Sequence, residues 1–305
     1  MSKIWVSIDG GGTKTCICAC EESKNILYSE RFGTANYKSA SIKTAEENLC
    51  FGIGKMMKKL NISPQNIEGA VVGLSGCDTR EDREIYTKII SQTGIPVSKT
   101  YLCNDTELIF RGMTDEEGLC VIAGTGSIVC VYDKQGLKSR AGGWGAPLSD
   151  EGSGYWIGAQ IVKKMIRVLD GLEECETEVF YKIRKNYLKG CTNEQWKLSK
   201  LSVAEIASIA LAVFAAAEKG DKVCKEILEI SAEKITELIL AACKKADLKN
   251  TVNIVAAGSL FSDFAYRENV FKKVSCVLSD RNICFLIPKL SPAAEGLRFA
   301  MNRFV

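Results

Sequence analysis

Asp9-Gly10-Gly11-Gly12-Thr13-Lys14-Thr15 directly follows an apolar, strand-like run at residues 4–8. A second glycine turn, Gly124-Thr125-Gly126-Ser127, follows the apolar run at 119–123. Glycine lets the backbone turn sharply, and successive N–H groups in such a turn form a concavity that binds anions. Hairpin turns are also rich in glycine. Two such loops, each with hydroxyl donors and each between apolar β-type runs, nevertheless favour two phosphate-binding loops and a nucleotide held between two related domains.

The strand pattern around the first loop recurs around the second. Three strands are predicted around each loop, which suggests a duplicated domain. The predicted strands are 3–9, 14–21 and 25–32 in the first set, and 118–123, 127–133 and 137–141 in the second. Between the sets we predict helices at 42–60 and 80–93, strands at 69–74 and 99–103, and a helix that starts near Asp105.

The second half of the sequence is richer in helical patterns. Helices are predicted at 151–170, 174–187, 202–219 and 221–246, strands at 251–256 and 283–287, and a last helix at 292–303. No low-complexity linker divides the halves, and we place the domain boundary near 112–118. The order of elements predicts an α/β protein of two closely packed domains with a cleft between them.

The composition is that of an ordinary globular protein. The chain has 305 residues, 46% apolar and 25% charged, with a formal net charge of +3. This length is enough for two domains and a large core, and the charge gives no reason to expect a nucleic-acid partner. The N-terminus enters a strand at once and no apolar stretch is long enough to span a membrane. We therefore expect no signal peptide, no membrane partner and a cytoplasmic location.

The chain contains fourteen cysteines and no histidine. No two cysteines form a C-x-x-C pair, and Cys16, Cys18 and Cys20 alternate along a strand and so face one side. Most cysteines are interpreted as core residues in a reducing compartment, although a cysteine-ligated cluster stays open. Without histidine, Ser-His-Asp and Cys-His catalysis are excluded, and proton transfer must fall to Asp, Glu, Lys, Tyr or Cys.

Two aspartates follow apolar strands at places suited to chemistry. Asp9 ends the first strand, where it can hold a metal–phosphate complex directly or through water; the alternative is an aspartate that begins a turn. Asn104-Asp105 follows the strand at 99–103 and opens a helix, so an N-cap role is the alternative there. If a hydroxyl must be deprotonated, Asp105 is the best-placed candidate.

A glycine-dense loop at 142–154 carries Trp144 together with Asp150 and Glu151. An aromatic ring and carboxylates suit a sugar, which has apolar ring faces and a rim of hydroxyls. The alternative is a structural loop with a helix cap at Ser149 or Asp150. Other nucleotide motifs are absent: the sequence has no G-x-x-x-x-G-K-[ST], no G-x-G-x-x-G after the first strand, and no histidine for a protein-kinase catalytic loop.

These residues resemble the acetate and sugar kinase/Hsp70/actin superfamily, and within it the N-acetylglucosamine kinases of the BadF/BadG/BcrA/BcrD ATPase family. The resemblance covers essentially the whole chain. Each motif is weak alone, but their order and spacing together are specific. The motifs are the stretch from Asp9 to Thr15, Gly33-Thr34-Ala35-Asn36, Gly73-Leu74-Ser75-Gly76, Asn104-Asp105, Gly124-Thr125-Gly126-Ser127, Gly142-Gly143-Trp144-Gly145, Asp150-Glu151-Gly152-Ser153, Ala257-Gly258-Ser259 and Pro292-Ala293-Ala294-Glu295-Gly296.

The resemblance implies two ribonuclease-H-like domains of the actin and sugar-kinase type, with ATP in the cleft between them. The first domain would span 1–115, with the C-terminal helix at 292–305 packing back on it, and the second would span 116–291. Family analogy also implies a homodimer.

The resemblance also implies roles for individual residues. Asp105 matches the catalytic carboxylate. For Asp9, which ends the first strand, we expect that it holds Mg²⁺ largely through water. The sugar-contacting positions would be Asn36, Ser75, Asp105, Gly143, Trp144, Gly145 and Asp150. The ATP-binding positions would be Gly11, Gly12, Thr13, Lys14, Thr15, Gly124, Thr125, Gly126, Ser127, Phe214, Gly258, Ser259 and Ser262.

The implied activity is transfer of the γ-phosphoryl group of ATP to the 6-hydroxyl of N-acetylglucosamine, with N-acetylmuramic acid as a further substrate. Glucosamine is an alternative substrate. The activator ATPases of 2-hydroxyacyl-CoA dehydratases share the fold but bind an iron–sulfur cluster, and abundant cysteine keeps that alternative open. Sugar-responsive regulators of the same fold usually carry a DNA-binding segment at one end, for which we expect no room in this chain.

Overall fold

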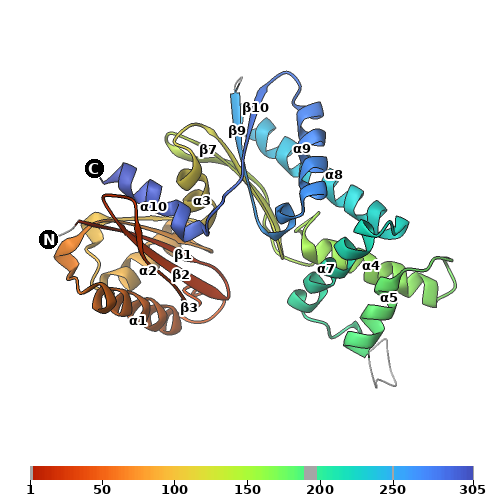
Figure 1. Ribbon diagram of the computed structural model, residues 1–305, viewed down its shortest axis with the longest axis horizontal. Coiled ribbons are helices and arrows are strands. Elements are labelled where there is room, and N and C mark those ends of the chain that lie inside the picture. Colours follow the sequence, from red (N-terminus) through yellow and green to blue (C-terminus); the bar gives the residue numbers. More distant parts are fainter. Residues whose placement is uncertain (1–2, 189–197, 249–250, 305) are drawn as a thin grey trace. The chain divides into compact units, whose positions relative to one another are not determined.

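The computed structural model describes residues 3–188, 198–248 and 251–304. Contacts between residues divide the chain into two compact units. Unit 1 comprises Met1–Cys120 and Leu286–Val305, and unit 2 comprises Val121–Phe285. Unit 1 is therefore built from both ends of the chain (Figure 1).

Unit 1 is built on a five-stranded mixed sheet with the strand order β3-β2-β1-β4-β5. The strands are β1 (Ile4–Gly10), β2 (Lys14–Glu21), β3 (Ile26–Gly33), β4 (Ile67–Leu74) and β5 (Thr100–Cys103). The first three form an antiparallel meander, whereas β4 runs parallel to β1, and β5 runs parallel to β4. The carboxyl ends of β1, β4 and β5 consequently meet at one edge of the sheet.

Helices cover both faces of this sheet. They are α1 (Ile42–Leu60), α2 (Arg80–Ser91), α3 (Asp105–Met113) and α10 (Pro292–Arg303), with short 3-10 turns η1 (Pro64–Asn66) and η2 (Val97–Lys99). Leu49 of α1 and Tyr86 of α2 pack on one face with Ile8 and Ile17. On the other face, Leu297 of α10 packs with residues that include Trp5, Leu108, Cys16, Cys18 and Cys20.

The prediction that these three cysteines share one face is confirmed. They are buried under the last helix of the chain, which lies beside β1 (Figure 1). The contact is close, because a Cβ added at Gly296 of α10 would lie 2.3 Å from the Ser7 hydroxyl of β1. A glycine is needed at this crossing.

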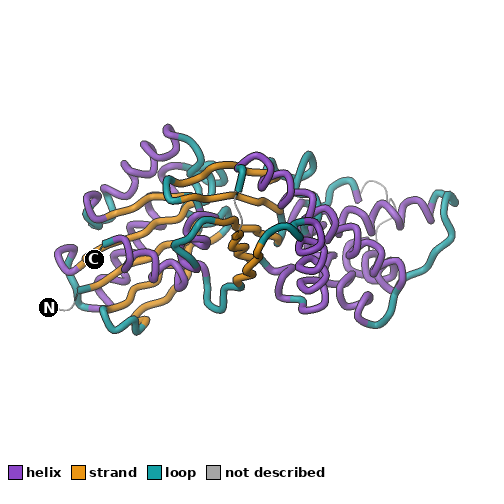
Figure 2. Tube along the Cα trace, turned by 90° about the horizontal axis from the view of Figure 1, so that it is seen from above, coloured by secondary structure: helices purple, strands orange, loops and turns teal. Residues whose placement is uncertain are grey.

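Unit 2 is also built on a five-stranded sheet, with the order β10-β9-β6-β7-β8. Read from β8, this order corresponds strand by strand to that of unit 1. Its strands are β6 (Gly118–Ala123), β7 (Ser127–Asp133), β8 (Gly136–Gly142), β9 (Thr251–Ala257) and β10 (Asn282–Leu286). Its helices are α4 (Gly154–Leu169), α5 (Glu178–Ile183), α7 (Val203–Glu218), α8 (Lys222–Ala246) and α9 (Phe264–Val277), with a π-helical turn η3 (Arg184–Leu188) and a 3-10 turn η4 (Ser259–Ser262). Within this unit α4, α5 and α7 gather at one end of the strands, as both views show (Figures 1 and 2). The repeated order agrees with the repeat predicted from the sequence.

The predicted strands and most helices are found within a few residues of their expected bounds, with two corrections. The helix expected over 174–187 is only α5, Glu178–Ile183, followed by the π-helical turn η3. Helix α9 was not predicted at all, although Asp263 caps it by accepting a hydrogen bond from the backbone N–H of Tyr266. The two α/β units with five-stranded mixed sheets confirm the predicted fold class.

All thirteen described cysteines are free thiols. Within residues 3–188, 198–248 and 251–304, no group of three or more cysteine and acidic side chains is arranged as a metal site. No helix among the same residues has the length and apolar character needed to cross a membrane.

Candidate functional site

The first glycine loop joins β1 to β2 and is held by a strap at residues 34–39. The Thr34 hydroxyl donates to the carbonyl of Gly11 at 2.8 Å, and the Ser39 hydroxyl donates to the carbonyl of Gly12 at 2.8 Å. Within the loop, the N–H of Gly11 donates to the carbonyl of Lys14 at 2.9 Å. These bonds occupy the carbonyls of the loop, so its conformation is set before any ligand binds.

The hydroxyl residues of this loop differ in their surroundings. Thr13 and Lys14 are exposed, whereas Thr15 is 1% exposed and faces the α1 side of the sheet beside Ile17. Its Oγ1 atom has no hydrogen-bond partner among the described residues. The structure thus leaves Thr13 and Lys14 accessible to a ligand and places the Thr15 side chain beneath the loop.

Asp9 and Asp105 lie at the edge where the carboxyl ends of the parallel strands meet. Asp9 pairs with Gly73 of β4, which pairs with Cys103 of β5, two residues before Asp105. Asp105 is the first residue of α3, and Asn104 caps that helix by accepting a hydrogen bond from the N–H of Thr106 at 2.9 Å. The predicted cap is therefore Asn104, which leaves the Asp105 carboxylate for another role.

The pKa values of both carboxyl groups are raised. Burial, followed by the negative charge of Asp9 and then that of Asp78, raises the pKa of Asp105 to about 7. Burial, followed by the neighbouring Cys16, raises the pKa of Asp9 to about 6, although Lys14 opposes the shift. Part of each residue still reaches the surface. Two accessible carboxyl groups with pKa values near neutrality are typical of a reactive site.

Asn36 and Ser75 lie at the same edge of unit 1. The Asn36 side-chain oxygen accepts from the N–H groups of Lys38 and Ser39, at 2.8 and 3.3 Å. The N–H of Ser75 donates to the carbonyl of Gly10 at 2.8 Å. The structure therefore gathers these two predicted sugar-contacting residues around the first glycine loop.

The second glycine loop, Gly124 to Ser127, rests on the N-terminus of α4. The N–H of Gly154 donates to the carbonyl of Gly124 at 2.7 Å, and the N–H of Tyr155 donates to that of Thr125 at 3.1 Å. The loop itself closes through the N–H of Gly124 and the carbonyl of Gly126, at 2.9 Å. As in unit 1, bonds to neighbouring segments hold the carbonyls of the loop.

Gly258 and Ser259 lie directly beside this second loop. Gly258 has a φ of 103°, and a Cβ there would lie 2.2 Å from the carbonyl oxygen of Ala123. A Cβ added at Gly124 would lie 3.6 Å from the Ser259 hydroxyl oxygen. Two segments more than a hundred residues apart in sequence thus form one surface, and both belong to the set that the resemblance assigns to ATP.

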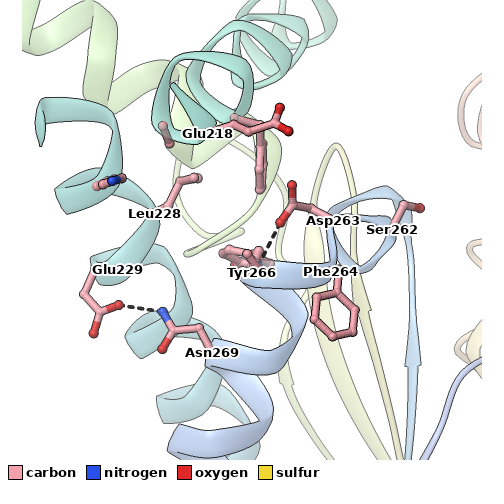
Figure 3. A pocket seen from close by; sticks show the side chains of 12 residues that line it. Glu218, Leu228, Glu229, Ser262, Asp263, Phe264, Tyr266 and Asn269 are labelled. Atoms are coloured by element: carbon pink, nitrogen blue, oxygen red, sulfur yellow. Dashed lines mark hydrogen bonds between the residues drawn. The ribbon is translucent and has the colours of Figure 1, made fainter. Parts of the chain in front are cut away.

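A pocket of about 640 Å³ opens among α7, α8, η4 and α9 (Figure 3). It contains both Phe214 and Ser262, which the resemblance places near the adenosine. The rings of Phe214 and Tyr266 meet edge to face, with centroids 5.4 Å apart. The pocket has the size of a small-molecule site. Sequence reasoning missed its α9 side, formed by Phe264, Ala265, Tyr266 and Asn269.

The predicted sugar loop at 142–154 is tightly folded in unit 2. Gly142, Gly143 and Gly145 have φ values of 75°, 69° and 89°, which glycine adopts readily. Trp144 is 78% exposed, and the Arg140 guanidinium lies 5.0 Å from its ring centroid while donating to the carbonyl of Gly143 at 2.9 Å. The arginine therefore holds the ring at the surface of the loop.

Asp150 is the buried carboxylate of this loop. Its φ is 62°. Burial raises the pKa of its carboxyl group, and the backbone N–H groups of Ser127, Ala146 and Gly145 oppose that shift. A Cβ added at Gly126 would lie 2.8 Å from the Asp150 carboxylate. Asp150 thus lies against the second glycine loop, whereas Trp144 is open to solvent.

Comparison with known proteins identifies similar chains. An N-acetylmuramic acid/N-acetylglucosamine kinase from Clostridium acetobutylicum is 30% identical over 276 residues, which cover 89% of this chain and 90% of that protein. An N-acetyl-D-glucosamine kinase from Dictyostelium discoideum is 28% identical over 261 residues, 81% of this chain and 82% of that protein. The crystal structure of a candidate N-acetylglucosamine kinase from Chromobacterium violaceum superposes with a TM-score of 0.72 at 20% identity, covering 97% and 98% of the two chains.

The match to a family is equally broad. Residues 6–283 match the model of the BadF/BadG/BcrA/BcrD ATPase family, and this range contains both glycine loops, Asp9, Asp105 and the Gly258 segment. The family predicted from the sequence is therefore confirmed. The chain belongs to the BadF/BadG/BcrA/BcrD ATPase family.

Proposed function

We propose that the protein is an ATP-dependent amino-sugar kinase that phosphorylates the 6-hydroxyl of N-acetylglucosamine and also of N-acetylmuramic acid. The kinase activities named for the two relatives support the substrate class. The single observation that carries the proposal is Asp105, an accessible carboxylate with a pKa of about 7, set beside Asp9 and the first glycine loop. In phosphoryl transfer the protein mainly positions the reactants and stabilises charge, so one well-placed base is enough.

Asp105 acts as the general base in this proposal. Its carboxylate takes the proton from the sugar hydroxyl while that oxygen forms a bond to the γ-phosphorus and the bond to the β-phosphate oxygen breaks. The products are the sugar phosphate, ADP and a proton. A base with a pKa near the working pH is half ionised and still basic enough to accept the proton.

The residues present also fit ATP and Mg²⁺. Asp9 is a half-buried carboxylate whose charge raises the pKa of Asp105, so the edge that holds both has a surplus of negative charge that a cation would offset. Asp9 would hold Mg²⁺ through water, since magnesium gives up its water reluctantly. When bound, Mg²⁺ neutralises charge on the phosphate oxygens.

The nucleotide residues are divided between the two units in this proposal. Thr13 and the first glycine loop bind the terminal phosphates, and Thr125 with the second loop binds the remaining phosphates. The pocket beside α9 takes the adenosine. Asn36, Ser75, Gly143, Trp144, Gly145 and Asp150 contact the sugar. A homodimer and a cytoplasmic location complete the proposal, and the dimer can be checked by light scattering.

The deciding experiment is a coupled assay of ADP formation with Mg²⁺ and five conditions. These are N-acetylglucosamine, N-acetylmuramic acid, glucosamine, glucose and no sugar. We expect turnover that depends on an N-acetylated amino sugar, with the product identified as the 6-phosphate by NMR. Turnover with glucosamine alone would identify glucosamine as the substrate in place of the N-acetylated sugars. ATP hydrolysis without any sugar would reject the kinase proposal and favour a role as an activator ATPase. Measuring the iron content of this protein would then test that alternative.

Trp144→Ala tests the sugar-binding role of the loop at 142–154. The ring is exposed and stacked by Arg140, so its removal leaves no cavity in the core. We expect the KM for the sugar to rise about tenfold, as for loss of a stacking surface worth about 1 kcal/mol or more. The KM for ATP and the melting temperature should not change. Equal increases in both KM values would show that the ring is structural.

The pH dependence tests the state of Asp105. Because its pKa is about 7 and the base must be ionised, kcat/KM for the sugar should rise with pH and level off above about pH 8. Initial rates measured from about pH 5 to about pH 9 at low sugar concentration give this profile. A flat profile across that range would contradict a base with a raised pKa.

A further inference from the structure

The strap at residues 34–39 and the turn at 75–79 meet at one buried carboxylate that no motif contains. Asp82 belongs to the first turn of α2, and its side chain is only 5% exposed. A buried carboxylate is costly unless its charge and its oxygens are satisfied. Each of its two oxygens is bonded, and the partners come from two different segments.

One oxygen of Asp82 holds the strap. Its Oδ1 accepts from the Tyr37 hydroxyl at 2.5 Å and lies 2.8 Å from Nζ of Lys38. These are the two residues that directly follow Asn36. The lysine supplies a positive charge against the buried carboxylate, and together with bonds from Thr79 it holds the pKa of Asp82 well below its usual range.

The other oxygen of Asp82 holds the turn after β4. Its Oδ2 accepts from the N–H groups of Asp78 and Thr79, at 3.1 and 2.8 Å, and from the Thr79 hydroxyl at 2.8 Å. Tyr86 adds a second connection to both segments, since its ring meets that of Tyr37 edge to face at 5.1 Å and its hydroxyl donates to the carbonyl of Ser75 at 3.2 Å. The strap and the turn are therefore joined twice.

The network continues to the proposed base. The side-chain N–H of Asn104 donates to the Asp78 carboxylate at 2.8 Å, and Asn104 directly precedes Asp105. The segments also touch, since a Cβ at Gly76 would lie 3.5 Å from the Asn36 amide and 3.3 Å from Cδ of Lys38. One carboxylate thus connects the segments that carry Asn36, Ser75 and Asp105.

We propose that Asp82 is a positioning residue for the sugar site, which acts through Tyr37 and Lys38 on the strap and through Asp78 on the turn. This inference rests on the proposed function. A bridge made of charge-assisted bonds around a buried group is geometrically demanding. Asp82 would hold the sugar-contacting residues in register before the sugar binds, and it would not affect the nucleotide loops of unit 2.

The alternative role for Asp82 is to stabilise α2 alone. Asp82 and Thr79 form a capping box, in which the Thr79 hydroxyl also accepts from the N–H of Asp82 at 3.1 Å. Such a box stabilises a helix without any influence on a distant ligand. The two roles share one side chain, so the test must remove the strap bonds and the cap separately.

The experiment compares four variants by steady-state kinetics and by thermal unfolding. Asp82→Asn removes the charge, Tyr37→Phe and Lys38→Met each remove a strap bond, and Thr79→Ala removes the cap. For Asp82→Asn we expect the KM for the sugar to rise about tenfold or more, with the KM for ATP unchanged. Tyr37→Phe and Lys38→Met should raise the sugar KM, with some loss of melting temperature because each leaves the buried carboxylate with one partner fewer.

Thr79→Ala is the matched control for the cap. It should lower the melting temperature and leave the sugar KM within about twofold, because Tyr37 and Lys38 keep their bonds to Asp82 and the backbone N–H groups of Asp78 and Thr79 still donate to it. If Tyr37→Phe and Lys38→Met leave the sugar KM unchanged, the positioning role is wrong, even where Asp82→Asn fails to fold. Absence of sugar-dependent turnover in the unaltered protein would instead reject the proposed function, so the two failures are distinguishable.

Discussion

Asp105→Asn is expected to lower kcat by at least about 10²–10⁴-fold, which is the range for loss of a general base. The fold should survive the change, because Asn104 remains the cap of α3 and an amide oxygen can still accept from the N–H of Thr106. The KM for ATP should be unchanged. Stopped assays at high enzyme concentration measure the residual rate, and Asp247→Asn is a matched control.

Asp247 suits this purpose because it is exposed and lies in unit 2 with a φ of 49°, a conformation that asparagine tolerates. Near-normal turnover in Asp105→Asn would remove Asp105 from the catalytic role.

The same variant should also change the pH dependence of stability. The raised pKa of Asp105 favours the fold at low pH, and that contribution is lost as pH rises through about 7. The Asp105→Asn variant, whose side chain does not titrate, should not lose stability in this way as the pH rises.

Asp9→Asn is expected to lower kcat/KM for ATP by about 10²-fold or more, since charge stabilisation by a bound metal is worth several kcal/mol. Removal of the Asp9 charge should also lower the pKa of Asp105, because that charge is one of the causes that raise it. The rise of kcat/KM for the sugar should therefore move to lower pH. Titration with Mg²⁺ at several pH values measures both effects.

Those two effects separate a metal-binding role from a purely electrostatic role. An unchanged Mg²⁺ requirement together with a shifted pH profile would show that Asp9 only tunes Asp105. An unchanged pH profile would show that the two carboxylates do not interact. Either result would revise the proposal for Asp9 while leaving the general base untouched.

Local sequence patterns were sufficient for most of the fold. Helix α1 has the predicted bounds at both ends, because Ser41 caps its start and Asn61, with a φ of 51°, ends it. Helix α9 was missed although Tyr266, Val270 and Val274 are buried at intervals of four residues. The helix has more charged residues than buried apolar ones. Its apolar face is therefore too narrow for the sequence pattern to indicate a helix.

The site was less accessible to sequence reasoning, because its properties arise from distant contacts. Asp82 lies among Arg80, Glu81, Arg83 and Glu84, so the sequence alone suggests a solvated helix face. Only the fold shows that it meets Tyr37, which is 45 positions away. The pKa of Asp105 likewise depends on its burial and on Asp9, a residue of another strand. Sequence motifs were enough to name the candidate residues. The burial and the neighbours of those residues could be described only from the structure.

The discontinuous construction of unit 1 has a consequence for biosynthesis. Helix α10 covers the sheet face that carries Trp5, Cys16, Cys18 and Cys20, yet a ribosome must complete Val121–Phe285 before it supplies that helix. At about 5–20 residues per second this face lacks α10 for on the order of ten seconds. The three thiols, sheltered in the finished protein, are open to oxidants during that interval. The timing of synthesis therefore sets when these cysteines are vulnerable.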